Sequence, residues 1–151
     1  MQKLNLPPFS AKTEEINGKL HIFDIIRMKN IVLTPEEWVR QHFIHLLISQ
    51  NYPKGLIAVE KLVVVNNLRQ RADIVIYNRK GNPALIVECK APQISLDNSV
   101  IAQAARYNSQ LNVPYIVITN GLATYCVYID LATKKYEVLT SLPTFEALND
   151  V

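Results

Sequence analysis

The stretch from Arg71 to Lys90 constrains the fold more than any other part of this chain. Its sequence is RADIVIYNRKGNPALIVECK, in which two apolar, β-branched runs, 73–77 and 84–89, flank the turn-forming residues 78–83. Strand-like runs on either side of a short Asn-, Gly- and Pro-containing segment are typical of a β-hairpin. We therefore expect two antiparallel strands.

The hairpin register predicts where its charged residues meet. A four-residue loop would pair Asn78 with Pro83 and, counting outward, Asp73 with Glu88, and directly opposed residues share a face of the sheet. Lys90 lies two residues beyond Glu88 and so belongs to the same face. Two acids and a lysine are thus expected together at one end of the hairpin.

Opposed acids point to a bound cation. Like charges placed opposite one another destabilise a sheet, and two carboxylates about 4 Å apart repel by roughly 4 kcal/mol at an effective dielectric constant of about 20. Lys90 could offset part of this repulsion. Mg²⁺ does so better, because proteins hold it with one or two carboxylates together with substrate phosphate. We therefore predict a site for Mg²⁺, or for Mn²⁺ in its place.

Composition favours one cytoplasmic domain. A chain of 151 residues can remove roughly 68 to 70% of its unfolded surface from water. Its apolar runs are far shorter than the roughly 20 residues of a membrane span, and its N-terminus lacks the apolar core of a secretion signal. We expect an N-terminal surface arm at 1–18, one domain at 19–140, and a short helix with a frayed tail at 141–151.

Glycines, cysteines and charge exclude other classes. The four glycines are isolated, so the chain has no phosphate-binding loop for ATP. Cys89 and Cys126 lie in apolar runs and are expected in the core. A net charge of +3 is compatible with nucleic acid but does not by itself argue for it.

A helix is predicted to begin at Pro35. Thr34 is a suitable N-cap and Glu37, three residues later, can complete a capping box. Glu36 shares the expected buried face, and Arg40 could pair with it one turn later. Alternatively, both acids only complement the helix dipole. The buried face is expected to carry Val39, Phe43, Leu46 and Leu47.

The remaining pattern predicts an α/β domain. Both faces of the hairpin are apolar, with 74, 76, 85 and 87 on one and 75 and 86 on the other, so layers should cover both faces. Glu60, in a strand before the hairpin, could pair with Arg71 or Lys90 or support the site. The other expected elements are short strands at 19–24 and 25–33, strands at 56–65, 113–119, 122–131 and 136–139, and a helix at 97–111.

The charged hairpin also resembles a known family. Asp73 with Glu88-Cys89-Lys90 is similar to the signature of the PD-(D/E)XK nucleases, although Ala72 stands where that signature has Pro. Five blocks resemble the N-terminal nuclease domain of type I restriction enzyme R subunits: TPEEWVRQ at 34–41, RADIVI at 71–76, VECKAP at 87–92, QAARY at 103–107 and TNG at 119–121. The resemblance covers about residues 20–130. It implies a restriction-endonuclease-like αβββαβ core, with a mixed central sheet flanked by helices.

The resemblance also implies roles for particular residues. Asp73, Glu88, the backbone carbonyl of Cys89 and an acid of the first helix would bind the metal, and we assign that acid as Glu36 rather than Glu37. Lys90 would orient water or stabilise charge on the phosphate.

Gln103 and Tyr107 match an element that lies beside the metal site in the family. Gln103 could orient water or phosphate, whereas Tyr107 could contact substrate or belong to the core. Arg71 and Arg106 are candidates for phosphate contacts, with solvated salt bridges as the alternative.

The function predicted from the sequence is Mg²⁺-dependent endonucleolytic cleavage of DNA by a restriction-type nuclease domain without its ATP-driven motor. The expected partners are DNA and further subunits of a restriction system, and the sequence leaves open whether the chain forms a homodimer. The rival function is a catalytically silent module that binds nucleic acid or protein. A third alternative is a metal-free structural domain in which Lys90 neutralises the acids.

Overall fold

The main sheet contains six strands among the described residues, in the spatial order β4-β5-β6-β7-β8-β9. The computed structural model of the chain describes residues 1–150. Strands β6 and β7 run parallel and the other neighbours antiparallel. The bounds are β4 Ile57–Val65, β5 Leu68–Tyr77, β6 Pro83–Cys89, β7 Tyr115–Thr119, β8 Thr124–Ile129 and β9 Tyr136–Leu139.

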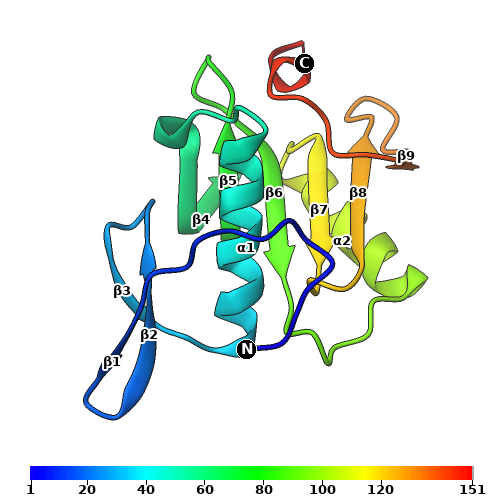
Figure 1. Cartoon of the computed structure of the whole chain (residues 1–151). Coiled ribbons are helices and arrows are strands. Elements are labelled where there is room, and N and C mark those ends of the chain that lie inside the picture. The colour runs from blue at the N-terminus through cyan, green and yellow to red at the C-terminus, as the bar shows by residue number, and fades with distance from the viewer. Residues whose placement is uncertain (151) are drawn as a thin grey trace.

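Helices cover both faces of the main sheet (Figure 1). Helix α1 (Pro35–Ser49) packs on the face that carries Ile74 and Val87, and α2 (Asn98–Gln110) packs on the face that carries Val75 and Ile86. From α1 to β7 the chain order is helix, three strands, helix, strand. The predicted α/β class, mixed sheet and flanking helices are confirmed, and Cys89 and Cys126 are buried free thiols.

The central hairpin keeps the predicted register where it matters for the site. Ile74 pairs with Val87, and the next two pairs follow in step. The expected pairing of Asn78 with Pro83 is wrong, because the register shifts at the end of β5 and Tyr77 takes Pro83 as its partner. Asn78 instead closes the loop, since its side-chain oxygen accepts hydrogen bonds from the backbone of Lys80 and Asn82, both at 3.0 Å.

The β4-β5 hairpin is interrupted at Glu60. Val59 pairs with Ile74 and Lys61 with Ala72, while Glu60 between them has a positive φ of 51°. One residue on each strand, Glu60 and Asp73, is left out of the pairing at this point, and the register is the same on both sides. Beyond it the hairpin packs against α2, where the Tyr107 hydroxyl donates to the Arg69 carbonyl at 3.2 Å.

The N-terminal segment is more structured than the predicted arm. Strand β1 (Thr13–Ile16) pairs with β2 (Lys19–Asp24), which pairs with β3 (Lys29–Val32), so these strands form a small antiparallel sheet. Asn17 and Gly18 both have positive φ, as a two-residue hairpin turn requires. The turn we expected at Asn17-Gly18 therefore joins two strands instead of ending an arm.

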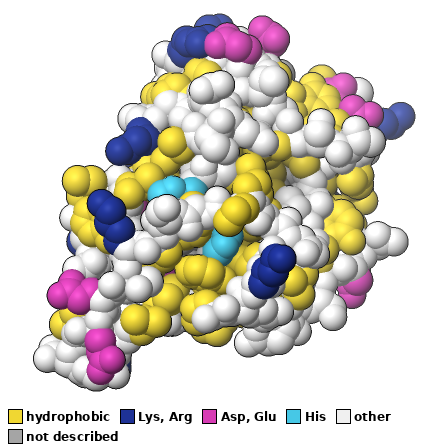
Figure 2. Space-filling model, in the orientation of Figure 1, with side chains coloured by type: hydrophobic (Ala, Val, Ile, Leu, Met, Phe, Trp, Pro, Cys, Tyr) yellow, Lys and Arg dark blue, Asp and Glu magenta, His cyan; other side chains and the backbone are white. Residues whose placement is uncertain are grey.

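Residues 1–12 form a strap across α1 (Figure 1). Leu4 is buried in the core, and the Asn5 N–H donates to the Gly121 carbonyl at 2.7 Å. Phe9 stacks on His45 and meets the His42 ring edge-on. Figure 2 shows histidines among apolar side chains on this face, with charged groups mainly towards its periphery.

The C-terminal segment is packed rather than frayed. One 3-10 turn, η1 (Lys54–Leu56), precedes the first strand of the main sheet, and another, η2 (Glu146–Asn149), follows its last strand. Phe145 and Leu148, three residues apart, are both buried in the α1-side core, as eclipsed positions of a 3-10 turn allow. The predicted tail at 141–151 is thus part of the domain up to residue 150, and residue 151 lies outside the described residues. No helix among residues 1–150 is long and apolar enough to cross a membrane.

The Gly121→Ala substitution tests the strap. Gly121 has a φ of +83°, and a Cβ there would lie 2.8 Å from Leu4 Cδ2 and 3.1 Å from Val39 Cγ2. We expect a loss of unfolding free energy of about 1 to 2 kcal/mol for the left-handed backbone, plus at least about 1 kcal/mol for overpacking, measured by urea denaturation. Gly81→Ala is the matched control, because φ is +85° there but a Cβ would meet nothing within 4 Å. Equal losses in the two variants would show that the strap does not pack as described.

Candidate active site

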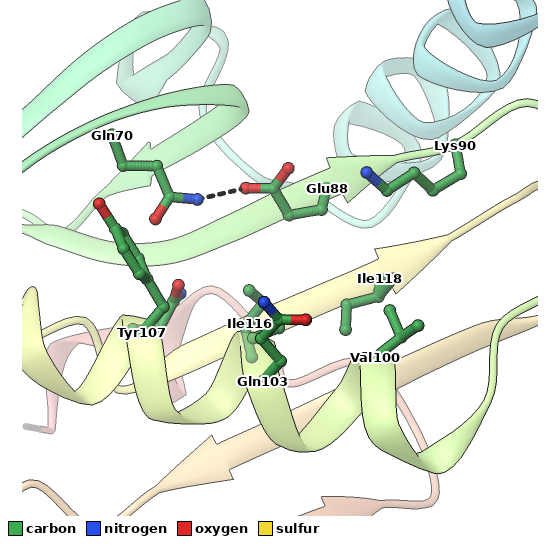
Figure 3. A pocket seen from close by; sticks show the side chains of 10 residues that line it. Gln70, Glu88, Lys90, Val100, Gln103, Tyr107, Ile116 and Ile118 are labelled. Atoms are coloured by element: carbon green, nitrogen blue, oxygen red, sulfur yellow. Dashed lines mark hydrogen bonds between the residues drawn. The ribbon is translucent and has the colours of Figure 1, made fainter.

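A cleft of about 320 Å³ lies beside the end of β6. Glu88 and Lys90 project towards it from the β6 side, and Gln103 and Tyr107 face them from α2 (Figure 3). The predicted alternation that places Glu88 and Lys90 on one side is therefore confirmed. The other lining residues are Gln70, Val100, Ala104, Asn108, Ile116 and Ile118.

The carboxyl group of Glu88 has a raised pKa, close to neutral pH. Its Oε1 accepts a hydrogen bond of 2.7 Å from the amide of Gln70. Burial, and then the negative charge of Asp73, raise the pKa of Glu88 to about 7, against the opposing influence of Lys90 and Gln70. At neutral pH this carboxyl group therefore exists in both protonation states.

Asp73 has different neighbours. Its Oδ1 accepts from Arg40 at 2.9 Å, and its Oδ2 accepts from the backbone N–H of Cys89 at 2.7 Å. Asp73 is thus tied to α1 and to β6, and it is not among the residues that line the cleft. We expected Asp73 to lie opposite Glu88 on one face of the hairpin, but Asp73 contacts α1 through Arg40, at the point where the β4-β5 ladder is interrupted at Glu60.

Arg40 is the centre of an acidic cluster. Its guanidinium lies 2.5 Å from Glu37, 3.1 Å from Glu36, 2.9 Å from Asp73 and 4.0 Å from Glu60. Burial alone would lower the pKa of Arg40, but the charges of Glu37 and Asp73 outweigh it and raise that pKa. The guanidinium therefore remains charged and relieves the repulsion among these acids.

A second arginine connects this cluster to the small sheet. Arg27 contacts Asp24 at 2.7 Å and Glu37 at 2.8 Å, and Gln41 donates to the same two carboxylates. Asp24 and Gln41 are completely buried. Polar groups in the interior are stable only when they are paired, so these contacts fix the small sheet to α1.

The two first-turn acids have the roles we predicted only in part. Thr34 Oγ1 accepts from the Glu37 N–H at 3.0 Å, which forms one half of the capping box. The Glu37 carboxylate does not form the other half of the capping box. It accepts hydrogen bonds from Arg27 and Arg40 instead, because buried charged groups are stable only when they are paired. We expected Glu36 on the buried face of the helix, but its side chain is 46% exposed, whereas Glu37 is buried. The expected Glu36-Arg40 pair forms. Arg40 thereby holds Glu36 next to Asp73.

The predicted substrate contacts lie around the cleft. Gln103 and Tyr107 line it, whereas Arg71 is exposed outside the lining and pairs with Glu60 at 3.5 Å. Arg106 is also exposed on α2 and does not line the cleft.

Three contributors to the site were missed. These are the contact of Arg40 with Asp73 and the amides of Gln70 and Asn108 in the cleft. The weak available signal was that Gln70 lies on the strand of Asp73, three residues earlier.

The donor set suits a hard divalent cation. Among residues 1–150 no cluster of three or more His, Cys, Asp or Glu side chains is grouped closely enough to hold a metal ion. Mg²⁺, however, is commonly held by only one or two carboxylates with the substrate phosphate. Asp73 and Glu88 are close enough for the charge of one to raise the pKa of the other. Two mutually repelling carboxylates are what such a cation stabilises, so the residues present fit the ion.

The fold and site together define an α/β domain whose central strand end carries two acids and a lysine beside an amide-lined cleft. A family model described as the type I restriction enzyme R protein N terminus matches residues 35–143. The chain belongs to this family, and the predicted resemblance is confirmed. The matched range includes every candidate site residue.

One solved structure supports the same fold. It is a fragment assigned to an HsdR subunit of a type I restriction enzyme from Vibrio vulnificus YJ016, with a TM-score of 0.54 and 19% sequence identity. The match covers 77% of this chain and 24% of that one. At this identity the likeness concerns the fold. Comparison with curated proteins gave no match.

Replacing Arg40 tests the acidic cluster. Arg40→Met would leave the buried carboxylate of Glu37 without one of its two arginines, so we expect a loss of unfolding free energy of about 3 to 5 kcal/mol, measured by chemical denaturation. The control is Arg79→Met, which removes an exposed ion pair with Glu146 and should change stability far less. A loss no larger than that of the control would mean that Arg40 does not support the fold.

The pKa of Glu88 predicts how stability varies with pH. Between about pH 4.5 and 7 the unfolded chain has released the Glu88 proton while the folded chain retains it, so the wild type loses stability as the pH rises through this range. Glu88→Gln does not titrate and keeps the acceptor for Gln70. We expect the variant to be more stable than the wild type above pH 7 by about 1 to 3 kcal/mol, and no more stable at pH 4.

Thermal unfolding followed across this pH range would measure the difference. Glu146→Gln serves as the control, because the arginine beside it lowers the pKa of Glu146 and its replacement should not stabilise the protein at neutral pH. A constant difference between wild type and Glu88→Gln at all pH values would contradict the assigned pKa.

Proposed function

We propose that this chain is a metal-dependent endonuclease domain that hydrolyses phosphodiester bonds of DNA. The observation that supports it most is the meeting of Glu88 and Lys90 in a cleft beside Asp73, in a chain of the type I R protein N-terminal family. Perturbed acids in a cleft are typical of functional sites. We also propose that the elements from α1 to β7 are the αβββαβ core of restriction-endonuclease-like folds.

Asp73, Glu88 and the backbone carbonyl of Cys89 would hold Mg²⁺ or Mn²⁺, with Glu36 contributing directly or through water. When bound, such an ion polarises a phosphate oxygen and lowers the pKa of water. The carboxyl group of Glu88 would enter this role as its carboxylate, and its pKa of about 7 means that it can lose its proton at physiological pH. Arg40 would hold Asp73 in place from the side of α1.

The remaining residues would act on the substrate. Lys90 presents a compact positive charge at the cleft, where it can stabilise the charge that develops on the phosphate. Gln103, at the cleft, can orient water or phosphate through its amide. Arg71 and Arg106, exposed outside the cleft, suit contacts with neighbouring phosphates of the strand. Tyr107 forms one wall against the substrate.

The partners follow from the same proposal. DNA is the substrate, and other subunits of a restriction system are the further partners, as membership of the type I R protein N-terminal family suggests.

A second candidate function rests on a specific observation. Both oxygens of Asp73 already have partners in Arg40 and the Cys89 N–H, and Glu88 can relieve the remaining repulsion by keeping a proton. The acids are therefore stable without a metal, which favours a silent module that binds DNA or protein. Metal binding and DNA cleavage separate the two functions.

The test is cleavage of supercoiled plasmid and of single-stranded DNA in Mg²⁺ or Mn²⁺. We expect wild-type protein to cut, and Lys90→Ala to cut at least about 100-fold more slowly because a charge that stabilises the transition state is removed. Calorimetry should show metal uptake by the wild type that Asp73→Asn abolishes. Uptake should also strengthen as the pH rises through about 7, since metal and proton compete for Glu88.

Arg79→Met is the control variant, because Arg79 lies outside the site, and it should cut as the wild type does. Cutting that persists at full rate in Lys90→Ala would assign the activity to a contaminant. An absence of both metal uptake and cutting would favour the silent module.

A further inference from the structure

The cleft contains a buried amide that the proposed chemistry does not use. Asn108 on α2 is completely buried and lines the cleft, yet neither its Oδ1 nor its Nδ2 has a hydrogen-bond partner among the described residues. An unpaired buried amide destabilises a fold. Unpaired buried polar groups are rare in native proteins and need an explanation. One explanation is a ligand that supplies the missing hydrogen-bond partners.

A second amide has the same property. Gln70 donates to Glu88 through its Nε2, while its Oε1 is buried without a partner among residues 1–150. Gln70 and Asn108, which both line the cleft, thus leave two oxygens and one nitrogen without partners among the described residues. Figure 3 shows the Gln70 amide directed towards Glu88, with Gln103 on the opposite side of the cleft.

Apart from Glu88, Lys90 and Gln103, the rest of the lining is aromatic or apolar. The Tyr107 ring stands beside Gln70 in Figure 3, and its hydroxyl is bonded to the Arg69 carbonyl at 3.2 Å, which holds the ring in place. Val100, Ala104, Ile116 and Ile118 form apolar surface. A fixed aromatic ring beside two amides suits a flat molecule that carries hydrogen-bonding groups along its edges. Nucleobases are such molecules, because they stack on aromatic side chains and are recognised along their edges by hydrogen bonds.

We infer that this cleft binds one nucleobase of the DNA, unstacked from its neighbours, next to the phosphate at Glu88 and Lys90. The inference rests on the proposed function and adds a substrate class to it. A volume of about 320 Å³ is at the lower end of the range for ligand pockets, so it suits a single base. A base inside a duplex cannot enter such a pocket. The preferred substrate is therefore single-stranded or locally unpaired DNA.

Titration of isotope-labelled wild-type protein with mononucleotides tests the base pocket directly. The ligands are the four deoxynucleoside 5′-monophosphates and, as the base-free comparison, 2-deoxyribose 5-phosphate. None of these ligands contains a phosphodiester bond that the protein could cut, so Mg²⁺ can be present throughout the titration. We expect at least one nucleotide to bind about ten-fold or more tightly than the sugar phosphate, as stacking and edge contacts imply, and to shift the side-chain amide resonances of Asn108 and Gln70.

Asn108→Leu has nearly the same shape and no polar atoms. It should reduce nucleotide affinity to that of the sugar phosphate and leave sugar-phosphate affinity unchanged. Asn98→Leu, an exposed position on the same helix, is the matched control and should bind as the wild type does. If Asn108→Leu does not fold, Asn108→Ala replaces it.

Three results would overturn the inference: equal affinity for nucleotides and sugar phosphate, no measurable nucleotide binding, or resonance shifts that bypass Asn108 and Gln70. Plasmid cutting with any of these results would leave the nuclease proposal standing without the base pocket. Nucleotide preference without metal-dependent cutting would support the pocket and refute the nuclease.

Discussion

The pairing of Arg40 with Glu37 and Asp73 is the interaction on which the site depends. A charged guanidinium is stable in the interior only with carboxylates in contact, and Arg40 finds them on its own helix and on β5. These contacts require α1 to lie at one position and rotation on the sheet. Arg27 joins Asp24 to the same Glu37, so the small sheet, α1 and β5 are held by one set of charges.

The two acids at the strand end coexist because their surroundings differ. Asp73 lies between a guanidinium and a backbone N–H, both of which stabilise its negative charge. Glu88 lies among apolar groups and a neutral amide, so burial raises its pKa to about 7. The strand end therefore carries one acid with fixed partners and one acid that can release a proton at neutral pH. Divergent environments of this kind suit a site that binds a cation or transfers protons.

Sequence reasoning succeeded where a pattern involves neighbouring residues. Counting outward from the predicted loop gave the correct register around Val75, although the pair that closes the loop was wrong, and Thr34 gave the correct start of α1. It failed for Asp73, because the contact with Arg40 on α1 and the interruption of the β4-β5 ladder at Glu60 leave no periodic signal in the sequence. It also failed for the two ends of the domain, since isolated apolar residues such as Leu4 and Leu148 in polar segments form no period.

The amino-acid sequence by itself determined the strands of the main sheet and its two flanking helices, the register of the central hairpin and the chemical types gathered at its end. These follow from alternation and capping, which act between residues close in the chain or paired across one turn. Only the tertiary structure decided that Arg40 meets Asp73, that Gln70 meets Glu88 and that Asn108 is buried unpaired in the cleft. The reason is physical: burial and charge pairing depend on distances between groups far apart in the chain, and packing alone sets those distances.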